Sequence, residues 1–260
     1  MRKILISIIF IAFGVNLAFA QNKEQSEQDT SFFKFGGTKI LFITDTTYVP
    51  KEKFSGHFAS LSFGINSFIQ GESSEYFDAK ALELNLGRSW EFNADAFDIS
   101  FNLYKQHFGV LTGLGFKFQN YRLANNYLIY NDKEHTYSEL DTVTNYTKSK
   151  LAINSVRVPV LFEWQNTYGR KHREIYFSAG MTFSYRMVSF MKYNYKIDGE
   201  KRKDKKFADY HLNPFQYTIL AKLGIGEFEF YFEYNLSKMF KSGEGIDANQ
   251  FSVGLILLDL

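Results

Sequence analysis

Strict alternation of apolar residues with polar or small residues recurs along this chain, often over ten or more positions. Phe215, Tyr217 and Ile219, for example, alternate with Gln216 and Thr218. Successive side chains of a β-strand point to opposite faces, so a period of two predicts strands with one apolar face. The pattern predicts an all-β chain, with strands near 59–66, 90–103, 108–119, 155–165, 175–186, 215–224, 228–237 and 251–257.

The second of these segments changes phase in its middle. Its apolar residues occupy even positions from Trp90 to Ala96 and odd positions from Phe97 to Leu103. A bulge of one residue at Ala96-Phe97 would restore a single apolar face. A break between two short strands is the alternative.

The links between the segments alternate in length. Long links follow the first, third, fifth and seventh segments, at 71–86, 124–150, 191–213 and 241–249, and short ones lie at 105–106, 166–172 and 225–226. Outer-membrane barrels have this arrangement, with short periplasmic turns and long external loops. A soluble sandwich has no reason to gather its long links at one end.

The polar face separates a membrane barrel from a water-soluble one. It consists of Ser, Thr, Gly, Asn and Gln with single charges, as in the lumen of a small barrel, whereas a lipocalin-type barrel turns its charges outward. We therefore predict an eight-stranded, antiparallel, up-and-down transmembrane β-barrel with a closed, side-chain-filled lumen and both termini in the periplasm. Aromatic residues near the strand ends suit two interfacial girdles: Trp90, Trp164, Tyr185, Tyr217 and Tyr234.

The N-terminus indicates export. Arg2 and Lys3 precede an apolar stretch and the small-residue site Ala18-Phe19-Ala20, which predicts a signal peptide at 1–20. An anchor helix is the alternative, but the stretch is short for a membrane span. Without the two basic residues the chain has 28 basic and 28 acidic residues. Net charge therefore offers no reason to expect a nucleic-acid partner.

The remaining chain divides into two parts. Residues 21–53 are predicted to form a periplasmic extension, with a possible extra strand within 32–44, and residues 54–260 the barrel. The expected location is the outer membrane of a Gram-negative cell. The absence of cysteine excludes a disulfide scaffold and a thiol-ligated metal.

Three groups of residues resemble the PorT-type outer-membrane β-barrel proteins of Bacteroidetes. They are Gly56-His57-Phe58 with 63–66, then 109–116 with Asn120-Tyr121-Arg122, and finally 156–161. The likeness runs from about Phe54 to the C-terminus, although the chain ends on Leu260 rather than on an aromatic residue. It implies an outer-membrane barrel with a structural, interaction or secretion-accessory role, and a periplasmic or envelope protein partner.

Charged residues on the inward faces predict a polar network. An eight-stranded lumen is filled by side chains, and a buried charge without a partner costs several kcal/mol. We therefore expect salt bridges that close the lumen, with a small-solute or ion channel as the alternative. The predicted network residues are Glu91, Asp95, Asp98, Lys117, Arg157, Glu163, Arg186, Lys222, Glu229 and Glu233.

No pattern predicts catalytic residues, a cofactor site or a metal site. A lipid A-modifying enzyme is the alternative, because His135 and His211 are expected near the external face, with Ser149, Ser155 or Ser184 as candidate nucleophiles. No spacing singles out a triad, so a non-catalytic protein is favoured.

The expected non-protein partners are outer-membrane lipids and lipopolysaccharide. The third long loop has a local excess of basic residues, at 192–206, that suits phosphate groups, although a solvated charged loop is the alternative. The second long loop, at 127–147, is rich in Tyr, Asn and Thr.

Overall fold

The computed structural model describes residues 32–35, 38–41, 54–168, 173–197 and 199–259. The predicted signal peptide and most of the predicted extension lie outside these residues. The described part is all-β, and its helical elements are two short 3₁₀ turns, η1 (Ala79–Leu82) and η2 (Leu86–Arg88). No helix in the described part has the length and apolar character needed to cross a bilayer.

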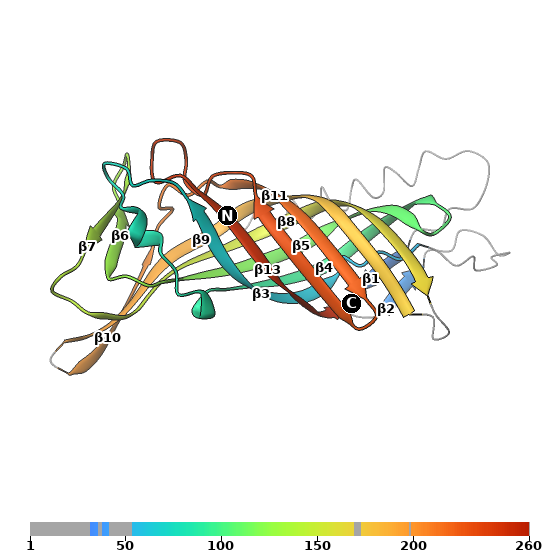
Figure 1. The fold of residues 1–260 in the computed structure, drawn as a ribbon, viewed down its shortest axis with the longest axis horizontal. Coiled ribbons are helices and arrows are strands. Elements are labelled where there is room, and N and C mark those ends of the chain that lie inside the picture. Colours follow the sequence, from blue (N-terminus) through green and yellow to red (C-terminus); the bar gives the residue numbers. More distant parts are fainter. Residues whose placement is uncertain (1–31, 36–37, 42–53, 169–172, 198, 260) are drawn as a thin grey trace.

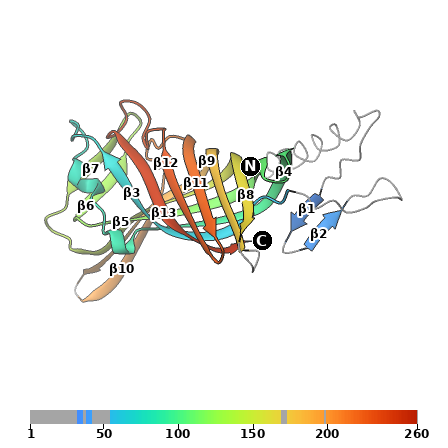
Figure 2. The same cartoon turned by 45° about the vertical axis from the view of Figure 1, so that its right-hand side comes forward.

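Eight long strands form an antiparallel ring (Figures 1 and 2). Each strand pairs with the next, and the last returns to the first, so all eight predicted strands are confirmed. In order around the ring they are β3 (Ser60–Gln70), β4 (Trp90–Tyr104), β5 (Phe108–Leu123), β8 (Tyr146–Tyr168), β9 (Arg173–Ile197), β11 (Phe215–Ile225), β12 (Phe228–Asn235) and β13 (Ala248–Asp259).

The phase change in β4 is a bulge. Asp95 lies opposite Gly115 and Phe97 lies opposite Leu114, so Ala96 is the extra residue and the predicted bulge is confirmed. The turn that follows β4 is a tight one. Lys105 (φ 42°) and Gln106 (φ 62°) both adopt left-handed backbone angles, as the two central residues of a type I′ turn require, and the His107 N–H donates to the Tyr104 carbonyl across them.

The ring has two different ends. At one, which we call the turn end, lie the connections after β4 and β11, the end of β8 and the start of β9, and also the start of β3 and the end of β13. At the other, the loop end, lie the longer connections, with the hairpin of β6 (Tyr127–Asn131) and β7 (Thr136–Leu140) and the strand β10 (Glu200–Phe207). A separate hairpin of β1 (Phe32–Phe35) and β2 (Thr38–Leu41) lies outside the ring, and β1 contacts β4.

The third long link differs from the predicted loop. Strand β9 continues to Ile197, and β10 pairs back along it from Glu200 to Phe207, so a hairpin replaces most of the loop expected at 191–213. Strand β8 likewise begins at Tyr146, inside the second predicted loop. Alternation predicts only strands that have one apolar face, and β10 is exposed along its whole length. Its strand conformation comes from hydrogen bonding to β9.

Two apolar clusters lie inside the ring. The loop-end core includes Tyr121, Ile153, Met191, Leu212 and Met239. The turn-end core consists of Phe54, Phe58, Leu111, Leu161, Leu220, Tyr231 and Ile256. Buried polar side chains lie between and beside these two cores.

Candidate functional site

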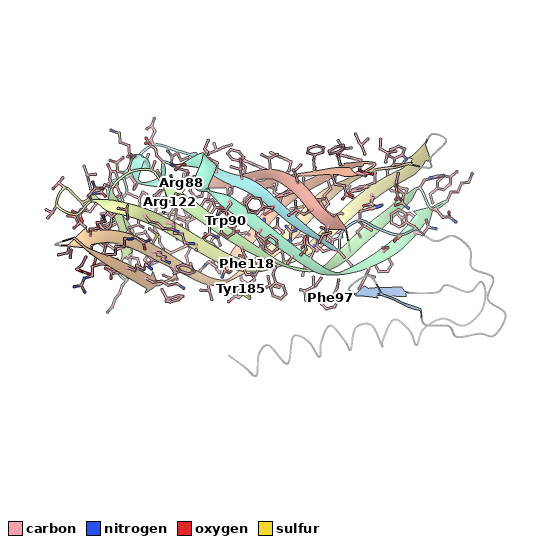
Figure 3. The ribbon with its side chains drawn as sticks, turned by 90° about the horizontal axis from the view of Figure 1, so that it is seen from below. Arg88, Trp90, Phe97, Phe118, Arg122 and Tyr185 are labelled. Carbon is pink, nitrogen blue, oxygen red and sulfur yellow. The ribbon has the colours of Figure 1, made fainter. Side chains whose placement is uncertain are left out.

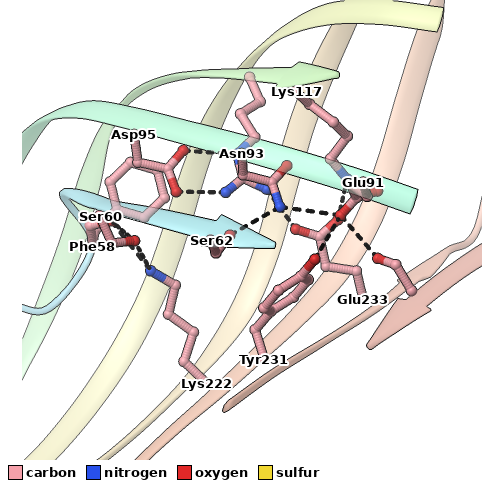
Figure 4. A network of polar contacts seen from close by, with 12 residues as sticks. Phe58, Ser60, Ser62, Glu91, Asn93, Asp95, Lys117, Lys222, Tyr231 and Glu233 are labelled. Atoms are coloured by element: carbon pink, nitrogen blue, oxygen red, sulfur yellow. Dashed lines mark hydrogen bonds and ion pairs between the residues drawn. The ribbon is translucent and has the colours of Figure 1, made fainter. Parts of the chain in front are cut away.

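A charged network fills the middle of the ring (Figure 4). Its members are Glu91 and Asp95 on β4, Lys117 on β5, Arg157 on β8 and Glu233 on β12, and none is more than 4% exposed. All five occupy inward positions of the alternating strands, because their neighbours in sequence carry the outward apolar side chains. Five of the ten predicted residues therefore meet in one cluster.

Arg157 is the centre of this network. Its Nε donates to Asp95 Oδ1 at 2.9 Å, its Nη2 donates to Asp95 Oδ2, and its Nη1 donates to Glu233 Oε1. Lys117 Nζ donates to Glu233 Oε2 and lies 3.7 Å from Glu91 Oε2. A planar guanidinium can bridge two carboxylates in this way, and a lysine cannot reproduce the geometry.

Glu91 is satisfied mainly by neutral donors. Asn93 Nδ2 (3.1 Å) and Ser252 Oγ (3.0 Å) donate to its Oε1, and Gln119 Nε2 donates to its Oε2 at 3.0 Å. The hydroxyl of Tyr231 lies 3.4 Å from Oε1. The network has three carboxylates and two cations, and these neutral hydrogen bonds replace the third cation in stabilising the buried charge.

A second polar cluster lies nearer the turn end. His57 Nδ1 and Glu163 Oε1 are 2.8 Å apart, and Ser178 Oγ donates to Glu163 Oε2 at 2.5 Å. The His57 ring stacks on Tyr176, with centroids 4.0 Å apart and planes within 5°. Glu163 was expected to bond to a lysine or arginine of the network, and its closest basic neighbour is instead this histidine. His57 reaches Glu163 because the chain just before β3 lies inside the ring. Strand periodicity does not indicate this, since His57 precedes the strand.

Three further predicted residues make hydrogen bonds to partners other than the five charged residues of the network. Lys222 Nζ donates to the carbonyl oxygens of His57 (3.1 Å) and Phe58 (3.2 Å), and Glu229 accepts a hydrogen bond from Tyr176 Oη at 2.6 Å. Arg186 was expected to bond to carboxylates of the network. Within the described part it instead donates to Ser189 Oγ and to the carbonyl of Leu212. The side chain of Asp98 lies outside the described part.

Phe58 is a network residue that the sequence did not indicate. Its ring is fully buried, 5.9 Å from the Arg157 guanidinium carbon and 5.0 Å from Lys222 Nζ, so it offers its π face to two cations. Gly113 leaves room for it, since a Cβ there would lie 2.8 Å from the Phe58 ring. A Cβ on Gly115 would lie 2.0 Å from Asp95 Oδ1. Both glycines therefore permit close packing of side chains inside the ring.

The candidate catalytic histidines lie at the loop end. His211 Nδ1 is 3.2 Å from Thr136 Oγ1, and its Nε2 is 3.9 Å from Glu244. Thr136 is fully buried, and its hydroxyl donates to the carbonyl of Tyr210 at 2.8 Å. That hydroxyl is therefore neither exposed to a substrate nor directed at the imidazole as a donor. His135 packs its ring against Tyr76, with centroids 4.2 Å apart.

The candidate serines do not complete such a constellation. Ser149, Ser155 and Ser184 are buried, and no hydrogen bond joins any of them to a histidine within the described part of the chain. The same part contains no group of three or more His, Cys, Asp or Glu side chains suited to a metal ion.

Comparisons with known proteins add no assignment. No protein-family model matches the chain, and searches of curated proteins and of solved structures found no significant match.

Proposed function

We propose that this chain is an integral outer-membrane protein, an eight-stranded transmembrane β-barrel with a closed lumen and no catalytic activity. Its role would be structural or interactive, within envelope assembly or secretion. The observation that carries the proposal is the reversal of polarity across the ring, with charges inside and large apolar side chains outside.

Outward side chains form an apolar belt around the ring. Strand β11 shows the contrast clearly, since Phe215 is 57% exposed and the adjacent Gln216 is 4% exposed. All eight ring strands contribute exposed large apolar residues; among them are Ile65, Phe101, Phe116, Phe162, Phe183, Tyr217, Phe232 and Leu255. Soluble monomers rarely expose apolar surface over more than a few hundred Å², so a belt on every strand favours a hydrocarbon environment.

The interior supports a closed lumen. The loop-end core, the charged network and the turn-end core follow one another from the loop end to the turn end, and each consists of buried side chains. A lumen of eight strands has room for little more than its own side chains. We therefore favour a plugged barrel over the small-solute channel.

The proposed role in the envelope rests on the resemblance to the PorT-type proteins. Those proteins imply a periplasmic or envelope protein partner, and the turn end, with the hairpin of β1 and β2 outside the ring, is the surface on which we place such a contact. The two termini of the ring also lie at this end, which would face the periplasm.

Fractionation of cells that produce the full chain tests the proposal. We expect the protein in the outer-membrane fraction after an alkaline carbonate wash. Unheated samples should migrate differently from boiled samples in SDS electrophoresis, because a closed barrel resists the detergent. Recovery of the folded protein in the soluble periplasmic fraction would overturn the proposal.

A further inference from the structure

A row of four basic residues crosses adjacent strands near the loop end. Arg122 on β5 lies opposite Lys150 on β8, Lys150 lies opposite Lys192 on β9, and Lys192 lies opposite Lys205 on β10. Strand spacing makes this row about 14 Å wide. Like charges directly opposite one another in a sheet are destabilising. A bound anion would therefore stabilise four such cations in register, and the sheet itself does not supply one.

The row faces outward. Tyr121, Leu151, Met191 and Tyr193, which flank the basic residues in sequence, belong to the loop-end core, so alternation turns the cations to the outside. Arg88 and Lys148 extend the basic group, since Arg88 acts electrostatically on Arg122, and Arg122 and Lys192 act on Lys148. None of these six cations forms an ion pair with a carboxylate of the described residues.

The surroundings of Lys150 reflect this crowding of positive charge. Four neighbouring cations act electrostatically on its ammonium group: Lys148, Lys192, Lys205 and Arg122. Its Nζ also donates to Asn120 Oδ1. A bound anion would relieve the repulsion within the group.

An aromatic groove lies directly beneath the row, on the side of the apolar belt. The next register pairs below the cations join Trp90 with Asn120, Asn120 with Ala152, and Ala152 with Phe190. The small Ala152 forms the floor. The groove is lined mainly by aromatic side chains, those of Phe63, Trp90, Phe92, Phe118 and Phe190. Figure 3 shows Arg88 and Arg122 side by side on the outside of the ring, with Trp90 and Phe118 following them.

We propose that this surface binds a phosphorylated glycolipid of the lipid A class, with phosphates on the basic row and an acyl chain in the aromatic groove. The inference rests on the proposed membrane location, which places the loop end at the external leaflet. Charge complementarity supports it, because the cations lie at headgroup level above apolar surface. A row about 14 Å wide also suits a headgroup with more than one phosphate.

Two charge-neutralising variants test the site. Lys150→Met and Lys192→Met, combined, remove the centre of the row and keep the aliphatic stems. Lys80→Met and Lys133→Met, combined, form the matched control, since both lysines are exposed at the loop end and outside the row. All proteins carry Trp164→Phe, so that Trp90, one of two tryptophans in the chain, reports from the groove.

The full chain in detergent micelles or lipid nanodiscs is titrated with lipid A, with dephosphorylated lipid A and with phosphatidylglycerol. Binding is followed by Trp90 fluorescence and native mass spectrometry. We expect the row variant to bind lipid A about tenfold more weakly, which corresponds to the loss of a charge-assisted hydrogen bond, and the control to be unchanged. Dephosphorylated lipid A and phosphatidylglycerol should bind as weakly as lipid A binds to the row variant.

Equal binding of phosphorylated and dephosphorylated lipid A, or equal affinity of the row variant and its control, would overturn the inference. Phosphatidylglycerol bound as tightly as lipid A would overturn the choice of a glycolipid. Insertion into nanodiscs is measured separately. A chain that inserts and shows no phosphate-dependent binding contradicts this inference alone, and a chain that does not insert contradicts the proposed function.

Discussion

An arginine in the middle of the apolar belt should destabilise the protein in a bilayer and leave a water-exposed surface nearly unaffected. Val160 on β8 is suited to this test, because it lies between Thr112 and Met181 of the flanking strands and is 41% exposed. In a barrel, Val160→Arg places a charge in hydrocarbon near the midplane, where the cost is about 2–4 kcal/mol. On a soluble protein the same substitution is expected to change stability by less than about 0.5 kcal/mol.

The control substitution introduces the same residue outside the belt. Val143 lies in the connection between β7 and β8 and is 94% exposed, so Val143→Arg should be neutral. Val253→Arg is a second belt variant. Val253 lies on β13, at another part of the ring, and is 52% exposed. If the belt surrounds the molecule, both belt variants lose stability, whereas a single protein-binding patch would affect at most one.

The assay is urea unfolding of the full chain in phosphatidylcholine vesicles, followed by tryptophan fluorescence. We expect the free energy of unfolding to fall by about 2–4 kcal/mol for each belt variant and to stay unchanged for the control. Where a belt variant fails to insert, its folded yield in vesicles is compared with that in micelles. Equal free energies of unfolding and equal yields for belt and control variants would refute the reasoning.

Four further predictions concern the interior and the loops. Arg157→Met leaves the carboxylates of the charged network without their central cation, so the free energy of unfolding should fall by about 3–5 kcal/mol in urea titrations. Gly113→Ala places a Cβ 2.0 Å from a backbone carbonyl and should lower the folded yield, whereas Gly87→Ala, whose Cβ has only one neighbour, at 3.9 Å, should fold normally. Backbone and tyrosine hydrogen bonds lower the pKa of Asp141 from 3.8 to about 2, so the stability that its carboxylate contributes is present above pH 4 and is lost as the pH falls toward 2. Hydrogen exchange of the Val143 and Thr144 amides, which donate to this carboxylate, should show the loss, and Asp141→Asn should abolish the pH dependence. Purified protein in planar bilayers should give no stable openings of porin size, and such openings would contradict the closed lumen.

Local pattern was sufficient to predict the strands. The period of two in segments such as 215–224 reflects a sheet with one apolar and one polar face, and the phase change at Ala96 indicated the bulge that the pairing confirms. These features depend on neighbours in sequence, which is why they could be predicted without the fold.

Polar strands could not be predicted, because a strand without an apolar face shows no alternation along the sequence. Strand β10 is exposed along its length, so no alternation distinguishes it from a charged loop, and only its pairing with β9 shows it to be a strand. Arg186 was assigned to the network by its inward phase, although phase does not show which partner an inward side chain bonds to.

The sequence by itself determined which residues face each side of each strand, and therefore that charges gather on one side and aromatic rings on the other. Only the tertiary structure decided which of them meet. Lys117 bonds to Glu233 across 116 positions because the ring closes, and Phe58 enters the network because the chain before β3 turns inward. The basic row from Arg122 to Lys205 likewise depends on the register of four strands. The physical reason is that periodicity is a local property of the backbone, whereas register and closure depend on hydrogen bonds between strands distant in sequence.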